Sequence, residues 1–333
     1  LLILKSINKF YFMNTVFCIG EALIDMICTD TNQSISDGEH FLKKCGGAPT
    51  NVAIALKVLG GNVINVACVG DDPFGNCIIK TLKEFNINTK YIIKDKKHFT
   101  TIAYVSLKQH GERDFYFQRG ADANIKIADI QHLHFSEVSI FHFGSATAFL
   151  EGDLLDTYFY LLNQSVKQNK FICFDPNYRE LLFGTKKEIF IERSYEFLKE
   201  AHLIKMSDEE ALLLSEKSTL DEALAYFSTF VKGVITITLG KEGTLLYLPQ
   251  NKQKRIVPSI KIESIDSTGA GDSFVATLLY QISQLDSKDM MSISEEQWIH
   301  FISKANIIGA KTCTYYGAIE AYKHLNKELL DIV

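Results

Sequence analysis

The sequence predicts an α/β protein, with a central, mostly parallel sheet, helices on both of its faces and a small β-sheet lid. Three observations support this prediction. Short β-branched and aromatic runs alternate with helical patterns along most of the chain, as in a parallel sheet covered on both sides. Two stretches, 25–43 and 100–117, break that order and supply strands for a second, smaller sheet. The composition, with 47% hydrophobic and 23% charged residues over 333 positions, is ordinary for a folded chain.

Continuous apolar runs mark the strands of the main sheet, and helical patterns fall between them. We predict buried strands at 63–69, 138–143, 171–174, 202–206 and 234–239. The helical patterns lie at 76–85, 154–167, 189–199 and 220–231. Further helices are expected directly after two glycine-containing runs that are described below.

The two interrupting stretches define the predicted lid. Residues 100–117 (TTIAYVSLKQHGERDFYF) indicate a hairpin with its turn at 109–112. A small sheet inserted into an α/β body is typical of a lid, and because its open edge can pair with a second copy we expect a homodimer. The expected units are a body at 13–24, 44–97 and 126–333, a lid at 25–43 and 98–125, and an N-terminal extension at 1–12.

Charge and cysteine content exclude several classes of partner and site. The net charge of −5, without a long basic run, argues against a nucleic-acid partner. No window approaches the apolar length of a membrane-spanning helix, so no membrane partner is expected. The seven cysteines include no C-x-x-C pair, and H-E-x-x-H is absent, which argues against a disulfide framework or a zinc site. We expect most cysteines to be small buried residues of a cytoplasmic protein.

The strongest local signal is the run DSTGAGD at 266–272, which leads into an apolar helix. Glycines ahead of a helix expose backbone N–H groups at the positive end of the helix dipole, and this arrangement binds anions. Asp272 places a carboxylate inside that anion site. It either accepts a proton from an attacking hydroxyl or only stabilises its helix, and spacing alone supports the two interpretations evenly.

Two further glycine loops are weaker signals. Gly46 and Gly47 run into a helix with Asn51, where a ligand can approach the backbone and meet an amide that both donates and accepts. An ordinary helix entry explains the same residues. The loop with Gly240 and Gly243 suits a turn as well as a nucleotide contact. No Walker loop is present, and the DSTGAGD run does not have the spacing of a dinucleotide fingerprint.

Taken together, these residues resemble the phosphofructokinase B type (ribokinase-like) family of carbohydrate kinases over nearly the whole chain. The family's C-terminal signature, D-[ST]-x-G-A-G-D, is present at 266–272. Its N-terminal signature, Gly-Gly before an Asn-bearing helix and then G-x-D-x-x-G, is present at 46–51 and 70–75. The fructokinase-like branch is indicated by GEALID at 20–25, GGAP at 46–49, FDPNYR at 174–179 and KMSDEE at 205–210. The resemblance implies a ribokinase-like fold.

The resemblance also implies which residues act on the sugar. Asp272 is then the base that takes the proton of a sugar hydroxyl. The amides of Gly269, Ala270 and Gly271 form the anion hole for the transferring phosphate. For Arg119, a surface position on a lid strand is nearly as good an explanation as sugar binding. The residues implied for sugar binding are Asp25, Gly46, Gly47, Asn51, Arg119, Asn177 and Arg179.

Metal and nucleotide positions follow from the same resemblance. Relatives often carry N-x-x-E at the metal, and here 207–210 keeps Glu210 but has Ser207 in place of the Asn, as in fructokinase-like members. Glu210 would hold Mg²⁺ through water. Asp266 and Thr268 match positions for a monovalent cation, but the departure at Cys313 from the usual small residues leaves K⁺ activation open. The residues implied for ATP are Ser207, Thr238, Gly240, Gly243, Asn306 and Ala310.

The implied function is ATP-dependent phosphorylation of a sugar, with fructose converted to fructose 6-phosphate. One alternative keeps the kinase and changes the sugar to 2-keto-3-deoxygluconate or ribose, and arginines near the sugar favour the acid. A second alternative is a non-catalytic regulator that binds sugar or nucleotide on the same fold. The aspartate at position 272 argues against the regulator, because a protein that only binds has no need of a base.

Overall fold

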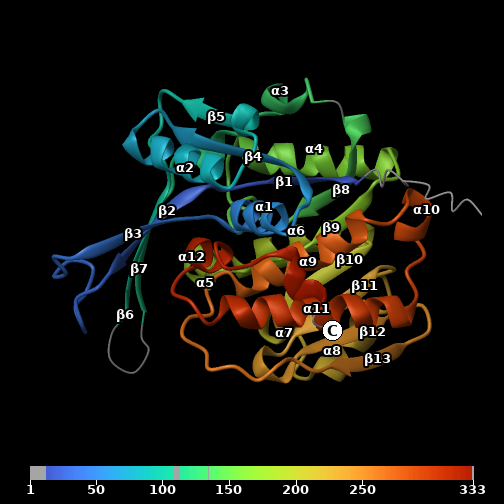
Figure 1. Cartoon of the computed structure of the whole chain (residues 1–333). Helices are drawn as coiled ribbons and strands as arrows, with labels where there is room; N and C mark the ends of the chain where they lie inside the picture. The colour runs from blue at the N-terminus through green and yellow to red at the C-terminus, as the bar shows by residue number, and fades with distance from the viewer. Residues whose placement is uncertain (1–12, 108–112, 134, 332–333) are drawn as a thin grey trace, which may run out of the picture.

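The computed structural model describes residues 13–107, 113–133 and 135–331, and a nine-stranded sheet forms its centre (Figure 1). The strand order is β13-β12-β11-β10-β9-β8-β1-β4-β5. Only β11–β12 and β12–β13 pair antiparallel, so the predicted mostly parallel sheet is confirmed. The strand bounds are β1 Thr15–Ile19, β4 Asn62–Gly70, β5 Ile92–Asp95, β8 Val138–Phe143, β9 Phe171–Phe174, β10 Leu203–Ser207, β11 Val234–Thr238, β12 Thr244–Leu248 and β13 Gln253–Val257.

Helices cover both faces of this sheet and enclose two separate cores. On β1, Val16 and Cys18 face one core, while Phe17 and Ile19 face the other. The first core packs under α1 Ala48–Val58, α2 Pro73–Glu84, α9 Ala270–Ser283, α11 Glu295–Thr312 and α12 Ala318–Tyr322. The second packs under α3 Ile127–Ile130, α4 Asp153–Lys167, α6 Lys187–Glu200, α7 Asp208–Ser215 and α8 Leu220–Phe227. Two short helices, α5 Glu180–Phe183 and α10 Ser287–Met290, complete the set.

Aromatic rings fill the second core. The ring of Phe197 on α6 lies 5.2 Å from Phe143 on β8 and 5.3 Å from Phe174 on β9, measured between ring centroids. Phe149 and Tyr158 complete the cluster at 5.2 and 5.4 Å from Phe197. Offset and edge-on contacts of this kind stabilise a core beyond simple burial. They hold α4 and α6 against the strands whose ends carry the polar residues described below.

The observed helices differ from the predicted ones by one or two residues at 154–167 and 189–199, and by more at 76–85 and 220–231. The helix predicted at 76–85 begins earlier, at Pro73, because the Asp72 side chain accepts from the N–H of Gly75 at 2.8 Å and caps it. The helix predicted at 220–231 ends at Phe227. There the hydroxyls of Ser228 and Thr229 bond back to backbone carbonyls at 2.7 Å, and such bonds compete with continued helix.

A separate four-stranded sheet, in the order β3-β2-β6-β7, projects from one end of the body (Figure 1). Its strands are β2 Leu23–Cys28, β3 Phe41–Gly46, β6 Ile102–Leu107 and β7 Arg113–Gln118. β6 and β7 pair antiparallel, as the predicted hairpin requires, while its turn at 109–112 lies outside the described residues. β2 starts before residue 25 and β3 ends after residue 43, so this sheet is longer than predicted. Its action as a lid stays a prediction.

The structure also bears on membrane-spanning helices and on the burial of the cysteines. Within the described ranges, no helix has both the length and the apolar character needed to cross a bilayer. All seven cysteines are free thiols. Four of them are buried, which agrees with the expectation for most of the cysteines: Cys18, Cys28, Cys68 and Cys173.

Candidate active site

The candidate site lies where the parallel strands end, which is where α/β sheets bind ligands. After β8, the Gly144 carbonyl accepts from the Asn177 side chain in the loop after β9, at 2.9 Å. From the middle of β10, Lys205 reaches Asp175 of that same loop. The N-terminus of α9 and the first turn of α1 meet these loops. Residues from widely separated parts of the chain therefore share one end of the sheet.

Asp272 lies in the first turn of α9, opposite Asn51 of α1. The Asn51 amide donates to Asp272 Oδ2 at 2.9 Å. Burial raises the pKa of Asp272 to about 6, the bond from Asn51 acts against this rise, and the nearby Asp175 adds to it. α9 starts here because Gly269 takes φ +79°, where a side chain would strike Ala318 and Tyr322. A carboxylate with this pKa is ionised at neutral pH and basic enough to accept a proton.

Asn51 also carries an unsatisfied atom. The atom is Oδ1, which has no hydrogen-bond partner in the described structure, although Asn51 is only 7% exposed. Buried polar atoms are normally paired, so an orphan beside Asp272 indicates a place for a ligand donor. A hydroxyl group that donates to Asn51 Oδ1 lies within reach of the Asp272 carboxylate.

Lys205 is a site residue that sequence reasoning did not assign. Its ammonium lies 3.1 Å from Asp175 Oδ2, and a Cβ placed on Gly271 would be 3.1 Å from Lys205 Nζ. Burial favours a lower pKa for Lys205, but the carboxylates of Asp175, Glu210 and Asp272 outweigh it and raise the pKa. The signal was a charged residue inside the otherwise apolar strand LIKMS. A fixed cation thus lies beside the positive end of α9.

The predicted anion hole needs one revision. The N–H of Ala270 donates to the Ser267 carbonyl at 3.1 Å, so this amide is used inside the loop. The first N–H groups of a helix have no partner within the helix, and those of Gly271 and Asp272 are in this position. The positive charge at this place therefore comes from the first turn of α9 and from Lys205 rather than from Ala270, and an anion hole here stays a prediction.

Asp25, Gly46 and Arg179 form the second side of the site. The Asp25 carboxylate occupies the space in which a Gly46 side chain would lie. Burial raises the pKa of Asp25 to about 7, the charge of Arg179 opposes this rise, and Glu21 adds to it. Arg179 is exposed and also lowers the pKa of Asp272, so its charge acts on both carboxylates. The structure brings these predicted residues to the same place.

Glu21 is a second residue that sequence reasoning missed, although it stands in the GEALID segment. Its carboxylate is 1% exposed and accepts from the N–H of Ala48 at 3.0 Å. The Ser145 hydroxyl, the Thr147 hydroxyl and the Ala146 N–H complete a set of four donors. Burial raises the pKa of Glu21, and the hydrogen bonds from Ser145 and Ala48 act against this rise. The Glu21 side chain caps α1 directly after Gly47, whose own φ is +109° and whose side-chain space is filled by the Glu21 carbonyl.

Two predicted ligand-binding residues are engaged within the protein. Arg119 donates to Asp122 at 3.2 Å, to the Thr147 carbonyl at 3.1 Å and to the Glu151 carbonyl. The Asn306 amide donates to the Val257 and Pro258 carbonyls, and its oxygen accepts from Thr244 at 2.7 Å. These bonds tie loops to strands and favour structural roles. Contacts of Arg119 with sugar and of Asn306 with nucleotide stay predictions.

Ser207 and Glu210 form the capping box of α7. Ser207 Oγ accepts from the Glu210 N–H at 3.1 Å, and Glu210 Oε2 accepts from the Ser207 N–H at 2.8 Å. Glu210 Oε1 accepts from the Tyr178 N–H, also at 2.8 Å. Within the described ranges, no three His, Cys, Asp or Glu side chains could hold a metal directly. This donor set fits Mg²⁺ held mainly through water, which that ion prefers.

The remaining predicted nucleotide and cation positions lie at the end of β11 and in the turn after it, in the loop before α9 and, for Ala310, within α11. Thr238 pairs with Ser207 across β10 and β11, and Gly240 begins the turn to β12. Asp266 accepts from the N–H and hydroxyl of Thr268 at 2.9 and 2.7 Å, and from the Gly317 N–H at 2.8 Å. These bonds close the loop before α9. A cation at Asp266 and Thr268 stays a prediction.

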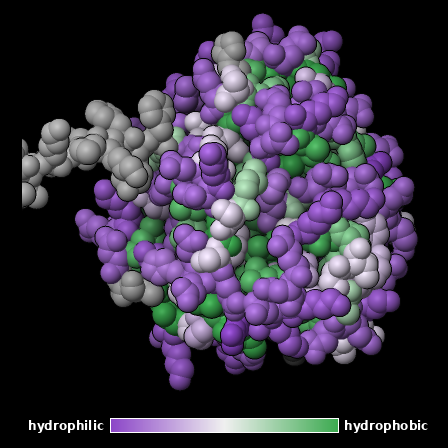
Figure 2. All heavy atoms as spheres, turned by 90° about the vertical axis from the view of Figure 1, so that its right-hand side faces the viewer, coloured by the Kyte–Doolittle hydropathy of each residue, from purple (hydrophilic) through white to green (hydrophobic). Residues whose placement is uncertain are grey.

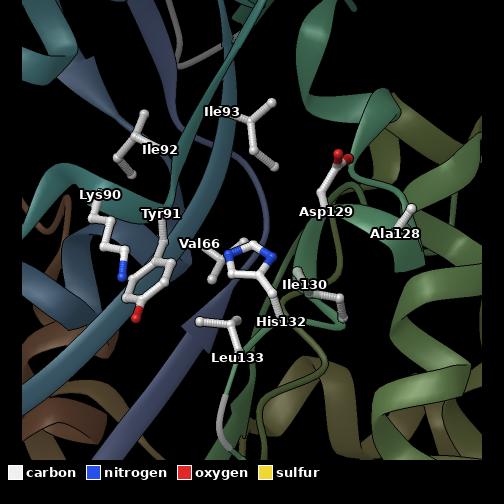
Figure 3. Close-up of a pocket in the computed structure, with 10 residues that line it drawn as sticks. All are labelled: Val66, Lys90, Tyr91, Ile92, Ile93, Ala128, Asp129, Ile130, His132 and Leu133. Carbon is white, nitrogen blue, oxygen red and sulfur yellow. The ribbon is translucent and has the colours of Figure 1, made fainter.

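Two other cavities lie away from this site. One of about 320 Å³, drawn in Figure 3, is lined by Tyr91 near β5 and by His132 after α3. Another, of about 850 Å³, lies among the strand ends opposite the site and includes His202 and Trp298. Neither cavity contains a predicted site residue. The face at the right of Figure 1 is mostly hydrophilic, with hydrophobic residues in scattered patches (Figure 2).

Comparison with known proteins gives consistent matches. A family model described as pfkB family carbohydrate kinase matches residues 13–325. A probable fructokinase-2 of Arabidopsis thaliana is 33% identical over 310 residues, or 92% of each chain. Fructokinase-2 of Zea mays is 32% identical over 312 residues, or 92% of this chain and 91% of the relative.

Solved structures agree with the sequence relatives. Fructokinase of Xylella fastidiosa with bound ATP has a TM-score of 0.84 at 27% identity, covering 96% of this chain and 97% of that one. A double mutant of Vibrio cholerae O395 fructokinase, in a form with fructose, ADP and potassium bound, has a TM-score of 0.82 at 29% identity. The match covers 96% of this chain and 97% of that structure.

Replacing Asn51 with leucine tests the contact with Asp272. Asn51→Leu keeps a similar volume but removes the donor that holds the pKa of Asp272 down. We expect this pKa to rise above about 6, measured by ¹³C carboxyl NMR titration. The pKa of Asp30, lowered by the backbone N–H groups of His40 and Glu39, should be the same in both proteins. An unchanged Asp272 titration would show that the hydrogen bond is not formed in solution.

Proposed function

The chain belongs to the pfkB family of carbohydrate kinases, and on that premise we propose that it transfers the γ-phosphate of ATP to the 6-hydroxyl of fructose. The observation that carries the proposal is the buried carboxylate of Asp272 at the N-terminus of α9, which accepts a hydrogen bond from Asn51 and lies next to Gly271, the neighbour of Lys205. Fructokinase relatives at about 32% identity and fructokinase structures over nearly the full length support the choice of sugar.

Each part of the site has a task in this reaction. Asp272 accepts the proton of the attacking hydroxyl, and the loss of this proton makes the hydroxyl oxygen a better nucleophile. Lys205 and the first turn of α9 oppose the negative charge of the transferring phosphate. Asp25 and Asn51 Oδ1 accept hydrogen bonds from other sugar hydroxyls, which positions the reacting one. Both of these acceptors are largely out of bulk water, where such bonds discriminate best.

ATP binding is assigned to the loops after β10 and β11, around Ser207, Thr238, Gly240 and Gly243. Mg²⁺ supplies charge neutralisation on the phosphates when bound, and Glu210 would hold its water. K⁺ beside Asp266 and Thr268 belongs to the same proposal, since the Vibrio cholerae O395 structure is a potassium-bound form.

Assembly and compartment complete the proposal. The small sheet exposes Leu42 at 45% and Tyr116 at 59%, so we propose that it covers the sugar and pairs with a second copy. The cysteines are free thiols, which suits a reducing compartment, and we propose the cytoplasm.

The acid sugar 2-keto-3-deoxygluconate is the one alternative that a specific observation favours. Arg179 is exposed and acts electrostatically on both Asp25 and Asp272, so it is placed to meet a substrate carboxylate. Arg119 gives no such support, because its guanidinium is engaged by Asp122 and two carbonyls. Fructose has no carboxylate and gains little from a guanidinium.

Substituting Asp272 tests the base. Asp272→Asn should leave binding of ATP and fructose within a few fold by calorimetry, while turnover in an ADP-release assay falls by about 10² or more. In the unmodified protein, kcat/KM should fall as the pH is lowered below about 7, because Asp25 and then Asp272 become protonated. Asp156→Asn, in the first turn of α4, is the control for helix stabilisation and should keep full turnover. Near-normal turnover in Asp272→Asn would remove this residue from the mechanism.

A substrate comparison tests the sugar. Among fructose, ribose and 2-keto-3-deoxygluconate, fructose should give the highest kcat/KM. Arg179→Lys keeps the charge but loses the planar donor pair. Because fructose has no carboxylate to accept from that pair, kcat/KM for fructose should change by less than about tenfold, or ~1.4 kcal/mol. A higher kcat/KM with the acid sugar, together with a much larger loss in Arg179→Lys, would replace fructose as the substrate. ATP binding without turnover of any sugar would favour the regulator.

The metal role is tested at Glu210. Activity should require Mg²⁺, and Glu210→Gln should raise the Mg²⁺ concentration needed for half-maximal rate, because an amide attracts metal-bound water less than a carboxylate does. Glu222→Gln removes the equivalent carboxylate from the capping box of α8 and is the matched control. If both variants keep the Mg²⁺ dependence of the unmodified protein, Glu210 only caps its helix.

A further inference from the structure

Cys45 and Cys77 bring two thiols together at the junction of the small sheet and the body. Cys45 is on β3, one residue before Gly46, and Cys77 is on α2. Their sulfur atoms are 3.8 Å apart. A disulfide bond is about 2.0 Å long, so only a small adjustment of side chains or backbone separates this pair from a bond.

The pair is also open to reagents. Both residues are half-buried, whereas four of the other five cysteines are buried. Burial, together with the neighbouring Cys77 thiol, raises the pKa of Cys45 to about 11. The Thr81 hydroxyl, 3.4 Å from the Cys45 sulfur, and the charge of Lys43 act against that rise. Cys45 is therefore mainly a thiol at neutral pH, and it reacts through its minor thiolate form. Neither cysteine is fully buried in the core, as a reaction with a dissolved disulfide requires.

We propose that Cys45 and Cys77 are a redox modification site, at which a small disulfide such as oxidised glutathione converts the two thiols into a protein disulfide. One cysteine thiolate attacks the small disulfide, releases one small thiol and leaves a mixed disulfide on the protein. The second thiolate attacks the protein sulfur of that bond and releases the other small thiol. The two cysteines are oxidised, the small disulfide is reduced, and the two protons end on the released thiols.

The bond would act on sugar binding, and this part of the inference rests on the proposed function. It fastens the end of β3 to α2 directly beside Gly46, which packs against the Asp25 carboxylate without room for a side chain. A displacement there moves Asp25 and the Gly46–Gly47 backbone away from their working positions. Displacements of about 1 Å are enough to reduce catalysis strongly. The loops after β10 and β11, which we assign to ATP, contain neither Cys45 nor Cys77, so ATP binding should change little.

The experiment uses the full chain, treated with oxidised or reduced glutathione, alkylated and digested. Mass spectrometry should find a Cys45–Cys77 crosslinked peptide, two hydrogens lighter than its reduced parts, after oxidation only. Hydrogen exchange of the 41–46 amides should slow in the oxidised protein, because β3 is fastened. The kcat/KM for fructose should fall by about tenfold or more, with the KM for ATP changed by less than about twofold, and dithiothreitol should reverse both effects.

Three variants provide the controls. Cys77→Ser and Cys45→Ser should form no crosslink and keep their activity under oxidation. Cys28→Ser, in the same small sheet, keeps the pair and should respond as the unmodified protein does. Absence of the crosslink would overturn the site, and a crosslink that leaves both exchange and activity unchanged would overturn its effect. If the reduced protein does not phosphorylate fructose, the proposed function fails separately, while the crosslink and the exchange of β3 still decide this inference.

Discussion

The site depends on one buried polar group, the carboxyl group of Glu21. Such a group taken out of water is costly unless hydrogen bonds replace its solvation, and four partners do so here. Those partners come from the start of α1 and from the loop after β8, so Glu21 holds the two in one arrangement. α1 in turn presents Asn51 to Asp272. The contact between Asn51 and the proposed base therefore depends on how Glu21 holds the start of α1.

The second organising feature is the uneven distribution of charge around Lys205. One ammonium lies among the carboxylates of Asp175, Glu210 and Asp272, so Lys205 alone does not balance these three groups close to the first turn of α9. Raised pKa values at Asp25 and Asp272 are a direct result of burial in these surroundings. The arrangement keeps the carboxylates basic, which suits proton acceptance, and it favours phosphates that arrive with a cation over bare phosphates.

Sequence patterns predicted five of the nine strands of the main sheet, namely β4, β8, β9, β10 and β11. Apolar runs such as 138–143 and 171–174 gave a clear signal because most of their residues are buried. Sequence patterns also placed Asp272 and Asn51 in one site through their motifs. They could not find Glu21, whose four partners are distant in sequence, or the role of Lys205, which depends on Asp175 in the loop after β9. The engaged guanidinium of Arg119 was equally out of reach, because its carbonyl partners carry no sequence signal.

The small sheet also bears on how the chain is made. β2 pairs in parallel with β6, with Ile24 opposite Ile102, and the intervening chain builds β4, β5 and two helices of the body. During synthesis, β2 and β3 can therefore pair early, but β2 keeps an open edge until the β6–β7 hairpin has emerged. Closing so long a loop is slow relative to local pairing, and open edges invite contact between nascent chains. A chaperone would therefore be most useful to this protein after β2 has paired with β3 and before the β6–β7 hairpin has emerged.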